Sequence, residues 1–279
     1  MTRLAARAAV AGLCLLAAAC AAPPETRDVQ APRIVSLNPC ADAILAEIAP
    51  DHLLALSHYS HDPRSSSMDL AAARRFRAVS GSAEEIAALR PDLVVASQFL
   101  PPATEQALAG MGLEVVKVRS IASLDDAREQ VRDLAALSGA SARGEAMVAK
   151  IDAAVAAAAP PDAARPRALV WQGGGLVPGD KTLIADLLHA AGFAHHSAVR
   201  GLGQGAILPL ERVMADAPHV IIAAGSPEMR ENRLLHHPAL GGLGHTRRAD
   251  LPPRLLWCGG PTIPETLARL AQIRREAVR

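Results

Sequence analysis

Three side chains that can bind a ligand or a metal ion lie close together in the first quarter of the chain. His58 and His61 flank Tyr59, the only tyrosine of the sequence, in a polar segment that follows the apolar run HLLALS. Imidazole and phenol groups in a loop after a strand can contact a ligand or ligate a metal, with His58 and His61 as metal candidates. The alternative is a tyrosine packed on a neighbour between two solvated histidines. No HExxH or CxxC motif accompanies them, so the spacing does not match a zinc site.

Further candidate ligand-binding residues stand where predicted strands end, because ligands of parallel sheets bind beyond the carboxyl ends of the strands. These residues are Asn38, Gln98, Phe99, Trp171 and Gln204. The indole of Trp171 could stack on a flat macrocycle, or it could belong to the core. The glycines at 173–175 and 201–205 are interpreted as backbone that lets a bulky ligand approach, since they lack the spacing of a dinucleotide loop.

The elements that must position these residues include a unit that occurs twice. Residues 84–97 read EEIAALRPDLVVAS and residues 211–224 read ERVMADAPHVIIAA, and the two align without a gap. Each predicts a short helix, a proline stop and a buried strand. Two copies this far apart indicate two α/β lobes of similar plan, and a cleft between lobes is a usual place for a ligand.

The order of elements predicts an α/β fold with two mostly parallel sheets. The N-terminal lobe is expected at 33–140 and the C-terminal lobe at 165–279, with RLLWCGG as the last strand. Between them, residues 141–160 contain almost only helix-forming residues and end at two prolines, which predicts one long connecting helix.

The beginning of the chain predicts export. Two arginines precede an apolar stretch at 8–19 that is short for a membrane span, and residues 1–20 are therefore interpreted as a signal peptide. Cys20 is either a lipid attachment site or a residue near a plain cleavage site, because Ala17 replaces the usual leucine. Residues 21–32 form a Pro-rich tether. The mature protein is expected in the periplasm, either free or anchored to a membrane by a lipid at Cys20.

The amino-acid composition limits the kinds of partner that the protein is expected to bind. The net charge is +1 and no basic run with interleaved aromatic residues occurs, so nucleic acid is excluded as a predicted partner. Aromatic residues make up only 2% of the chain, which leaves few rings to hold a ligand. Cys40 and Cys258 remain after the leader, and they are either a disulfide or two free thiols.

The ordered set of segments resembles the class III periplasmic binding proteins of ABC importers. It comprises the leader, RIVSL followed by Asn38-Pro39, the two repeated units, the long helix and KTLIADLL. The resemblance covers residues 33–279 and implies two Rossmann-like lobes joined by one helix. It further implies a monomer without a cofactor, which delivers a small ligand to an inner-membrane permease and its ATPase.

The resemblance also implies residue roles and a ligand class. Glu84 and Glu211 match the acidic residues that dock onto the permease; a glutamate in a first helical turn could instead complement the helix dipole. Tyr59 stands where the cobalamin receptor of the family contacts its corrin. The expected ligand is an iron–siderophore, another iron chelate or a corrinoid, with haem or a free metal ion as the alternative. The loop before Glu84 lacks a tryptophan, and Gly205 stands where an aromatic residue would be, which weakens the cobalamin interpretation.

An exported enzyme is the competing class. Such an enzyme would use the cleft histidines together with Cys40 as nucleophile. A serine hydrolase of the GxSxG type is not indicated, because that motif is absent from the sequence. The predicted protein is a binding protein and not an enzyme.

Overall fold

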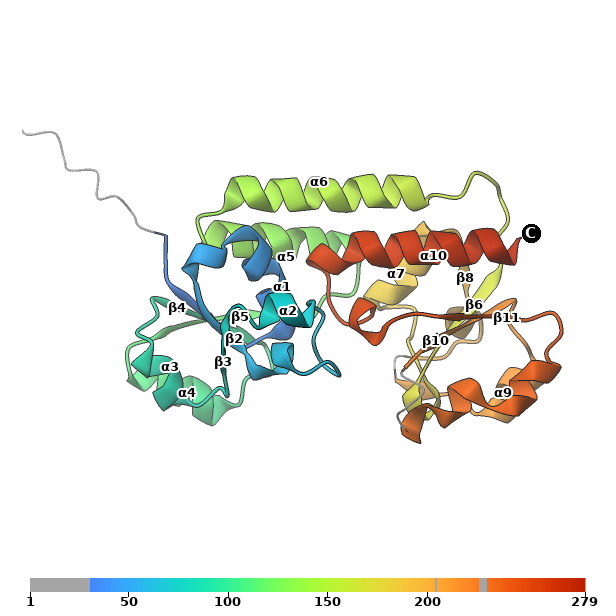
Figure 1. Ribbon diagram of the computed structural model, residues 1–279, viewed down its shortest axis with the longest axis horizontal. Coiled ribbons are helices and arrows are strands. Elements are labelled where there is room, and N and C mark those ends of the chain that lie inside the picture. The colour runs from blue at the N-terminus through green and yellow to red at the C-terminus, as the bar shows by residue number, and fades with distance from the viewer. Residues whose placement is uncertain (1–30, 204, 226–229, 279) are drawn as a thin grey trace, which may run out of the picture. The chain divides into compact units, whose positions relative to one another are not determined.

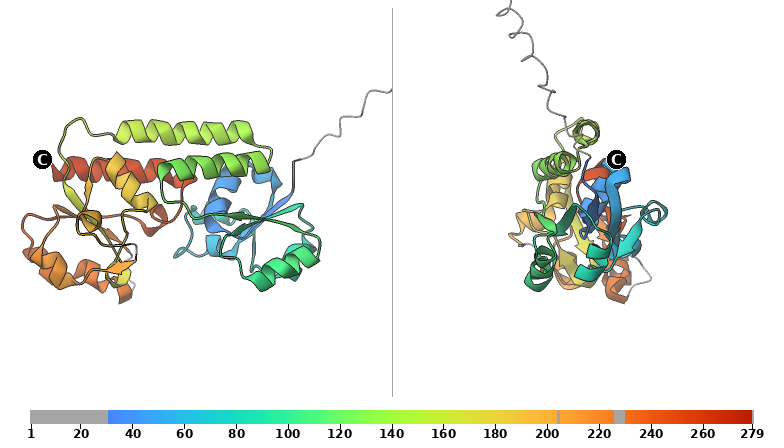
Figure 2. Two further views of the ribbon diagram at one scale, coloured as in Figure 1. Left: turned by 180° about the vertical axis from the view of Figure 1, so that it is seen from behind. Right: turned by 90° about the vertical axis from the view of Figure 1, so that its left-hand side faces the viewer.

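The computed structural model describes residues 31–203, 205–225 and 230–278. Residues from Ala31 onward form one compact unit, with two parallel sheets and a layer of helices that packs on both (Figures 1 and 2). The predicted α/β class with mostly parallel sheets is confirmed. We call the first sheet with helices α1–α4 the N-terminal lobe, and the second with α7–α9 the C-terminal lobe. The predicted boundaries of the lobes stay a prediction.

The N-terminal sheet has five parallel strands in the order β3-β2-β1-β4-β5. Its strands are β1 (Ile34–Ser36), β2 (Leu53–Ser57), β3 (Arg77–Val79), β4 (Leu93–Ser97) and β5 (Glu114–Val118). Its helices are α1 (Pro39–Ile48), α2 (Leu70–Ala73), α3 (Ala83–Ala88) and α4 (Pro102–Gly110), with 3-10 turns η1 (Pro50–His52) and η2 (His58–His61). The strand order reverses between β1 and β4, so the loops that leave these strands diverge and open a crevice.

The C-terminal lobe repeats this plan with four parallel strands in the order β11-β10-β6-β8. These are β6 (Arg167–Gln172), β8 (Ala194–His195), β10 (Val220–Ala224) and β11 (Arg247–Asp250), and a small antiparallel pair joins β7 (Leu176–Val177) to β9 (Ala206–Ile207). The helices are α7 (Leu183–Ala190), α8 (His196–Val199) and α9 (Leu210–Ala215). The 3-10 turns are η3 (Gly173–Gly175), η4 (Arg230–His236), η5 (Pro238–Gly242), η6 (Pro253–Leu255) and η7 (Gly260–Thr262).

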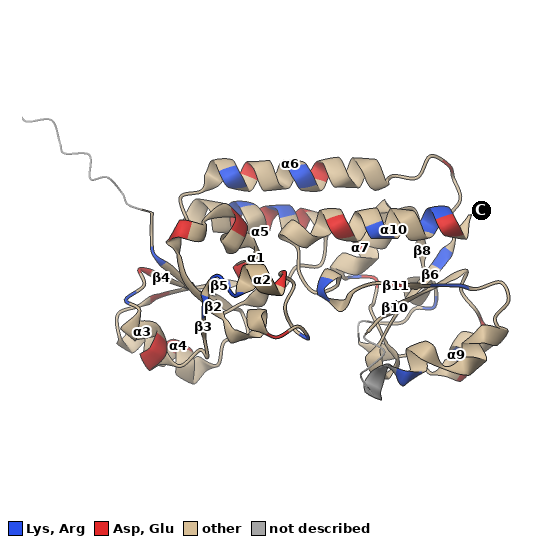
Figure 3. Ribbon diagram, viewed as in Figure 1, with Lys and Arg blue, Asp and Glu red and all other residues tan. Residues whose placement is uncertain are grey.

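Three long helices cover both sheets on one side (Figure 1). They are α5 (Leu124–Leu137), α6 (Ser141–Ala158) and α10 (Ile263–Ala277), and α6 packs against both of the others. Basic and acidic residues alternate along α6 (Figure 3), and ion pairs such as Arg132–Glu145 and Arg128–Asp152 join it to α5. The buried side chains beneath this layer form one core that includes residues of both sheets. None of the described helices combines the length and hydrophobicity that a membrane crossing requires.

The predicted last strand at RLLWCGG is wrong. The last strand of the described residues is β11, and the RLLWCGG segment contains the end of η6, a loop and the first residue of η7. Pro252 and Pro253 precede it and have no backbone N–H for a strand ladder. Leu255 is buried through the 3-10 turn instead. This difference decides where Trp257 lies.

Candidate functional site

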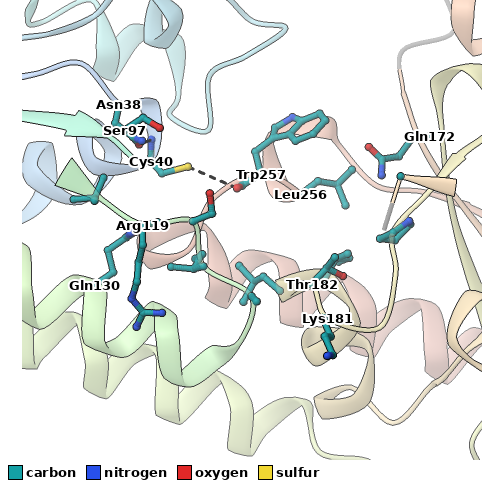
Figure 4. Close-up of a pocket in the computed structure, with 18 of the residues that line it drawn as sticks. Asn38, Cys40, Ser97, Arg119, Gln130, Gln172, Lys181, Thr182, Leu256 and Trp257 are labelled. Carbon is teal, nitrogen blue, oxygen red and sulfur yellow. Dashed lines mark hydrogen bonds between the residues drawn. The ribbon is translucent and has the colours of Figure 1, made fainter. Parts of the chain in front are cut away.

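A pocket of ≈ 410 Å³ lies between the two lobes, at the carboxyl ends of their strands. The loops after β1, β4 and β5 line one side, and the loop after β6, the start of α7 and the segment before η7 line the other (Figure 4). The polar lining residues include Asn38, Ser97, Gln130, Gln172, Lys181 and Thr182. The crevice between β1 and β4 is therefore part of the pocket, as the strand order requires.

Asn38 lines the pocket and begins α1 as its N-cap. Its side-chain Oδ1 accepts hydrogen bonds from the backbone N–H groups of Cys40 (2.9 Å) and Ala41 (3.1 Å). These bonds satisfy donors that a helix start otherwise leaves unpaired, and they fix the orientation of the amide. The side-chain nitrogen has no partner among the described residues, so it can donate to a ligand.

A disulfide joins Cys40 in the first turn of α1 to Cys258, 218 residues further along the chain. The Cα atoms are 5.0 Å apart. The Cys40 sulfur lies 3.6 Å from the carbonyl oxygen of Trp257, which lines the pocket next to Leu256 (Figure 4). Trp257 is 50% exposed and lines the pocket, and the disulfide anchors the residue that follows it in the chain.

The charged side chains that line the pocket are basic. No aspartate or glutamate occurs among its described lining residues, which do include Arg119 and Lys181. The Arg119 guanidinium is bound by Asp126 (2.6 Å) and by Glu129, and its hydrogen bond to Asp126 lowers the pKa of that carboxyl to about 2. Lys181 is exposed and has no ion pair within the described ranges. An anionic group of a ligand would therefore be attracted chiefly by Lys181.

Gln130 adds an acceptor that the protein does not satisfy. Its side chain is 7% exposed and its Nε2 donates to the carbonyl oxygen of Arg119 (3.0 Å). Its Oε1 is buried and has no partner among the described residues. A buried acceptor of this kind is stabilised by a donor from a ligand or water. The described part of the pocket lining therefore offers amide groups, one cation without an ion pair (Lys181) and one aromatic ring (Trp257).

The predicted group around Tyr59 forms η2 and lies outside the pocket lining. Tyr59 is 52% exposed, and its ring centroid is 4.1 Å from that of His58. His58 Nδ1 lies 3.3 Å from the carbonyl oxygen of Val79, and His61 Nε2 lies 3.1 Å from that of Ala73. Both imidazoles thus hold the loop onto the lobe. No cluster of three or more potential metal ligands occurs in the described parts of the chain. Contact of Tyr59 or His61 with a ligand stays a prediction.

Asp42 anchors this loop from beneath. Its side chain is fully buried on α1, and its Oδ2 accepts from the Ser57 backbone N–H (2.9 Å) and the Ser60 hydroxyl (2.6 Å). Burial raises the pKa of Asp42 to about 7, although hydrogen bonds from serines, Ser60 among them, act in the opposite direction. The position of η2 is therefore coupled to a carboxyl group that titrates near neutral pH.

Two of the remaining predicted contacts, Gln98 and Phe99, lie next to the pocket lining. Gln98 donates through Nε2 to the Ser120 hydroxyl (3.3 Å), and Ser120 lines the pocket. Phe99 follows two residues after the lining residue Ser97 and is 75% exposed. Gln204 lies outside the described residues. Their roles in binding stay predictions.

The prediction that Trp171 contacts a ligand is wrong. Its side chain is fully buried, and its Nε1 donates to the carbonyl oxygen of Leu208 (3.1 Å). Side chains alternate across a strand, so Trp171 and Leu169 share one core while Val170 faces another. Trp257 is the tryptophan at the pocket, and the sequence interpretation missed it because it assigned that segment to a strand. The signal in the sequence that could have indicated this role was the position of Trp257 next to Cys258.

Glu84 and Glu211 occupy equivalent places in the first turns of α3 and α9. Both side chains are exposed, and neither has an ion pair or hydrogen bond to another described residue. The N-cap of α3 is Ser82, and Glu85, not Glu84, accepts from the backbone N–H and the hydroxyl of Ser80 (2.7 Å each). Both helices lie away from the α5–α6–α10 layer (Figure 1). The two acids are thus available to a partner, and docking stays a prediction.

Comparison with known proteins agrees with this arrangement. The model of a family described as periplasmic binding protein matches residues 34–246. A cobalamin-binding protein of Halobacterium salinarum is 28% identical over 215 residues, which are 73% of this chain and 56% of that protein. The chain thus spans little more than half the length of this relative.

Solved structures share the fold. The periplasmic heme-binding protein of Roseiflexus sp. RS-1 is 24% identical, with a TM-score of 0.67 over 89% of this chain and all of that chain. A periplasmic heme-binding protein of Pseudomonas aeruginosa is 25% identical, with a TM-score of 0.67 over 87% of this chain and 92% of that one. The periplasmic vitamin B12-binding protein of Vibrio cholerae is 18% identical, with a TM-score of 0.67 over 90% and 99%.

Proposed function

This chain belongs to the periplasmic binding protein family, and on that premise we propose that it is the substrate-binding component of an ABC importer. It captures a metal chelate between its lobes and delivers it to an inner-membrane permease and ATPase. The ligand is a corrinoid or an iron chelate such as a ferric siderophore, with haem as the alternative. The protein performs no covalent chemistry on this ligand.

The pocket between the lobes carries this proposal. Its walls come from both sheets and combine the Trp257 indole, the Lys181 ammonium group and the amides of Asn38, Gln130 and Gln172. A flat chelate with amide or carboxylate substituents matches these groups, because the ring can stack while the substituents pair with amides and a cation. The names of the relatives, which include cobalamin, vitamin B12 and heme, support the same ligand class.

Delivery requires a second surface. We assign it to Glu84 and Glu211, whose exposed carboxylates occupy equivalent positions on the two lobes. Exposed ion pairs contribute only about 0.2–1 kcal/mol each, so these residues would orient the receptor on the permease more than bind it tightly. Family members work outside the cytoplasm. The leader at 1–20 and a lipid at Cys20 lie outside the described residues and belong to this proposal.

A titration of the exported, purified protein tests the function. Cyanocobalamin, hemin and several ferric siderophores are added separately, and binding is followed by calorimetry and by the visible absorbance of each chelate. We expect saturable binding of one class with a Kd below about 1 μM, which corresponds to about 8 kcal/mol. A folded protein that binds none of them would contradict the proposal. The heat-unfolded protein controls for nonspecific uptake of hemin.

A further inference from the structure

The backbone around Trp257 is fixed on both sides while its indole stays open. Leu255 is 2% exposed, and its carbonyl oxygen accepts from the Thr266 hydroxyl (3.1 Å). Cys258 is also 2% exposed, and its carbonyl oxygen accepts from the Thr262 hydroxyl (2.9 Å). Trp257 itself is nevertheless 50% exposed and is one of the residues that line the pocket. A large apolar ring held at the pocket by a rigid backbone is a preformed stacking surface.

The residues after Trp257 pack closely against the N-terminal lobe and α5. A Cβ at Gly259 would lie 2.4 Å from Ile121 Cδ1, and a Cβ at Gly260 would lie 2.6 Å from Ile44 Cγ1. Gly260 also has a φ of +80°, which a residue with a side chain rarely adopts. Only glycine fits this approach, so the segment reaches α1 closely enough for its cysteine to bond to Cys40.

The disulfide therefore couples two parts of the pocket wall. On one side of the bond, Cys40 is held by Asn38, whose amide lines the pocket. On the other side, Cys258 directly follows Trp257. The spacing between an amide donor and an aromatic face is thus fixed covalently, although the two residues are far apart in the sequence.

We propose that Trp257 contacts the ligand and determines specificity for a flat conjugated chelate, and that the Cys40–Cys258 disulfide is the positioning element that holds its indole at the pocket. The ligand contact of Trp257 rests on the proposed function, whereas the positioning role of the disulfide rests on the fold alone. A compact hydrophilic solute would gain nothing from the indole. A macrocycle can cover the exposed face and remove it from water.

Three variants and a control test the two parts separately. Trp257→Leu leaves the disulfide intact and removes the ring, while Trp257→Phe keeps a smaller ring at the same place. Cys40→Ser with Cys258→Ala removes the bond and keeps Trp257. Met111→Ala is the control, because Met111 is an exposed apolar residue (46%) outside the pocket lining. Circular dichroism shows which variants are folded, and affinities for cyanocobalamin and hemin are measured by calorimetry.

We expect Trp257→Leu to weaken binding of the chelate about tenfold or more, Trp257→Phe to restore part of it, and Met111→Ala to change nothing. Hydroxyl-radical footprinting should show Trp257 protected when the chelate binds. Trp257→Leu binding as tightly as wild type, with no protection in wild type, would overturn the contact role.

The positioning role is judged without any ligand. In the double cysteine variant, amide hydrogen exchange at residues 255–260 should become faster while exchange in the two sheets stays slow. Unchanged exchange at 255–260 would overturn this role. Wild type that binds neither cyanocobalamin nor hemin would overturn the specificity for a flat conjugated chelate, whereas the proposed function would be contradicted only if the ferric siderophores also failed to bind. The exchange result would still decide what the disulfide does.

Discussion

Asp42→Asn should make the protein more stable at alkaline pH and leave it nearly unchanged at acidic pH. The carboxyl of Asp42 is fully buried, and its pKa rises from 3.8 to about 7 because burial disfavours the charged form. A pKa that is higher in the folded state contributes stability that is complete below pH 3.8 and is lost as the pH rises through 7. At about 1.4 kcal/mol per pH unit, this interval corresponds to about 4 kcal/mol.

The asparagine amide imitates the protonated carboxyl. Its oxygen can still accept from the Ser57 N–H and the Ser60 hydroxyl, which donate to Asp42 in the wild type. The stability difference between variant and wild type should therefore be near zero at pH 4 and approach about 4 kcal/mol in favour of Asn by pH 8.

Urea denaturation at a series of pH values measures this difference. The wild-type curve alone is not sufficient, because burial lowers the pKa values of His195 and His196 to about 4 and these residues contribute with the opposite sign. The difference curve removes their contribution. Glu85→Gln is the matched control: hydrogen bonds from Ser80 lower the pKa of Glu85, so its difference curve should run the other way, with the wild type favoured as the pH rises.

A flat difference curve for Asp42→Asn would refute the assignment of a raised pKa. A variant that is less stable than wild type at pH 8 would show that the hydrogen bonds from serine stabilise the carboxylate more than burial destabilises it.

Four further predictions concern other parts of the fold. Removing both cysteines of the disulfide should lower the free energy of unfolding by about 5 kcal/mol in the chain-entropy model, given a separation of 218 residues; denaturation under nonreducing conditions tests this. Burial lowers the pKa of His195 to about 4, so between pH 6.5 and pH 4 its imidazole binds a proton only when the protein unfolds, and the melting temperature should fall as the pH is lowered over this range. In His195→Gln the melting temperature should fall less over the same range. Gly144→Ala should cost about 1–3 kcal/mol, because the new Cβ would lie 2.4 Å from Ala135 Cβ between α5 and α6; the urea midpoint measures it, and a gain would show that the helices can separate. Exchanging Glu84 and Glu211 for arginine should leave chelate affinity unchanged and reduce stimulation of the permease ATPase in vesicles; equal stimulation would remove them from the docking surface.

Local patterns in the sequence determined much of the fold. Buried runs such as Leu93–Ser97 and Val220–Ala224 are strands, and the caps at Ser82 and Ser123 begin helices where expected. These features depend on neighbouring residues, through alternation, helical spacing and capping, so a sequence carries them directly. The repeat of helix and strand likewise predicted two similar lobes.

The site depended on contacts that no local pattern contains. The face of β6 on which Trp171 lies depends on what packs there. The sequence named Trp171 as a candidate for ligand contact and left the core as the alternative, and in the structure Trp171 belongs to the core. Trp257 reaches the pocket because two prolines prevent a strand and two glycines allow close packing on α1 and α5. The sequence alone determined that a cleft exists and at which strand ends it lies. Tertiary structure decided which ring faces it, because that depends on residues brought together from opposite ends of the chain.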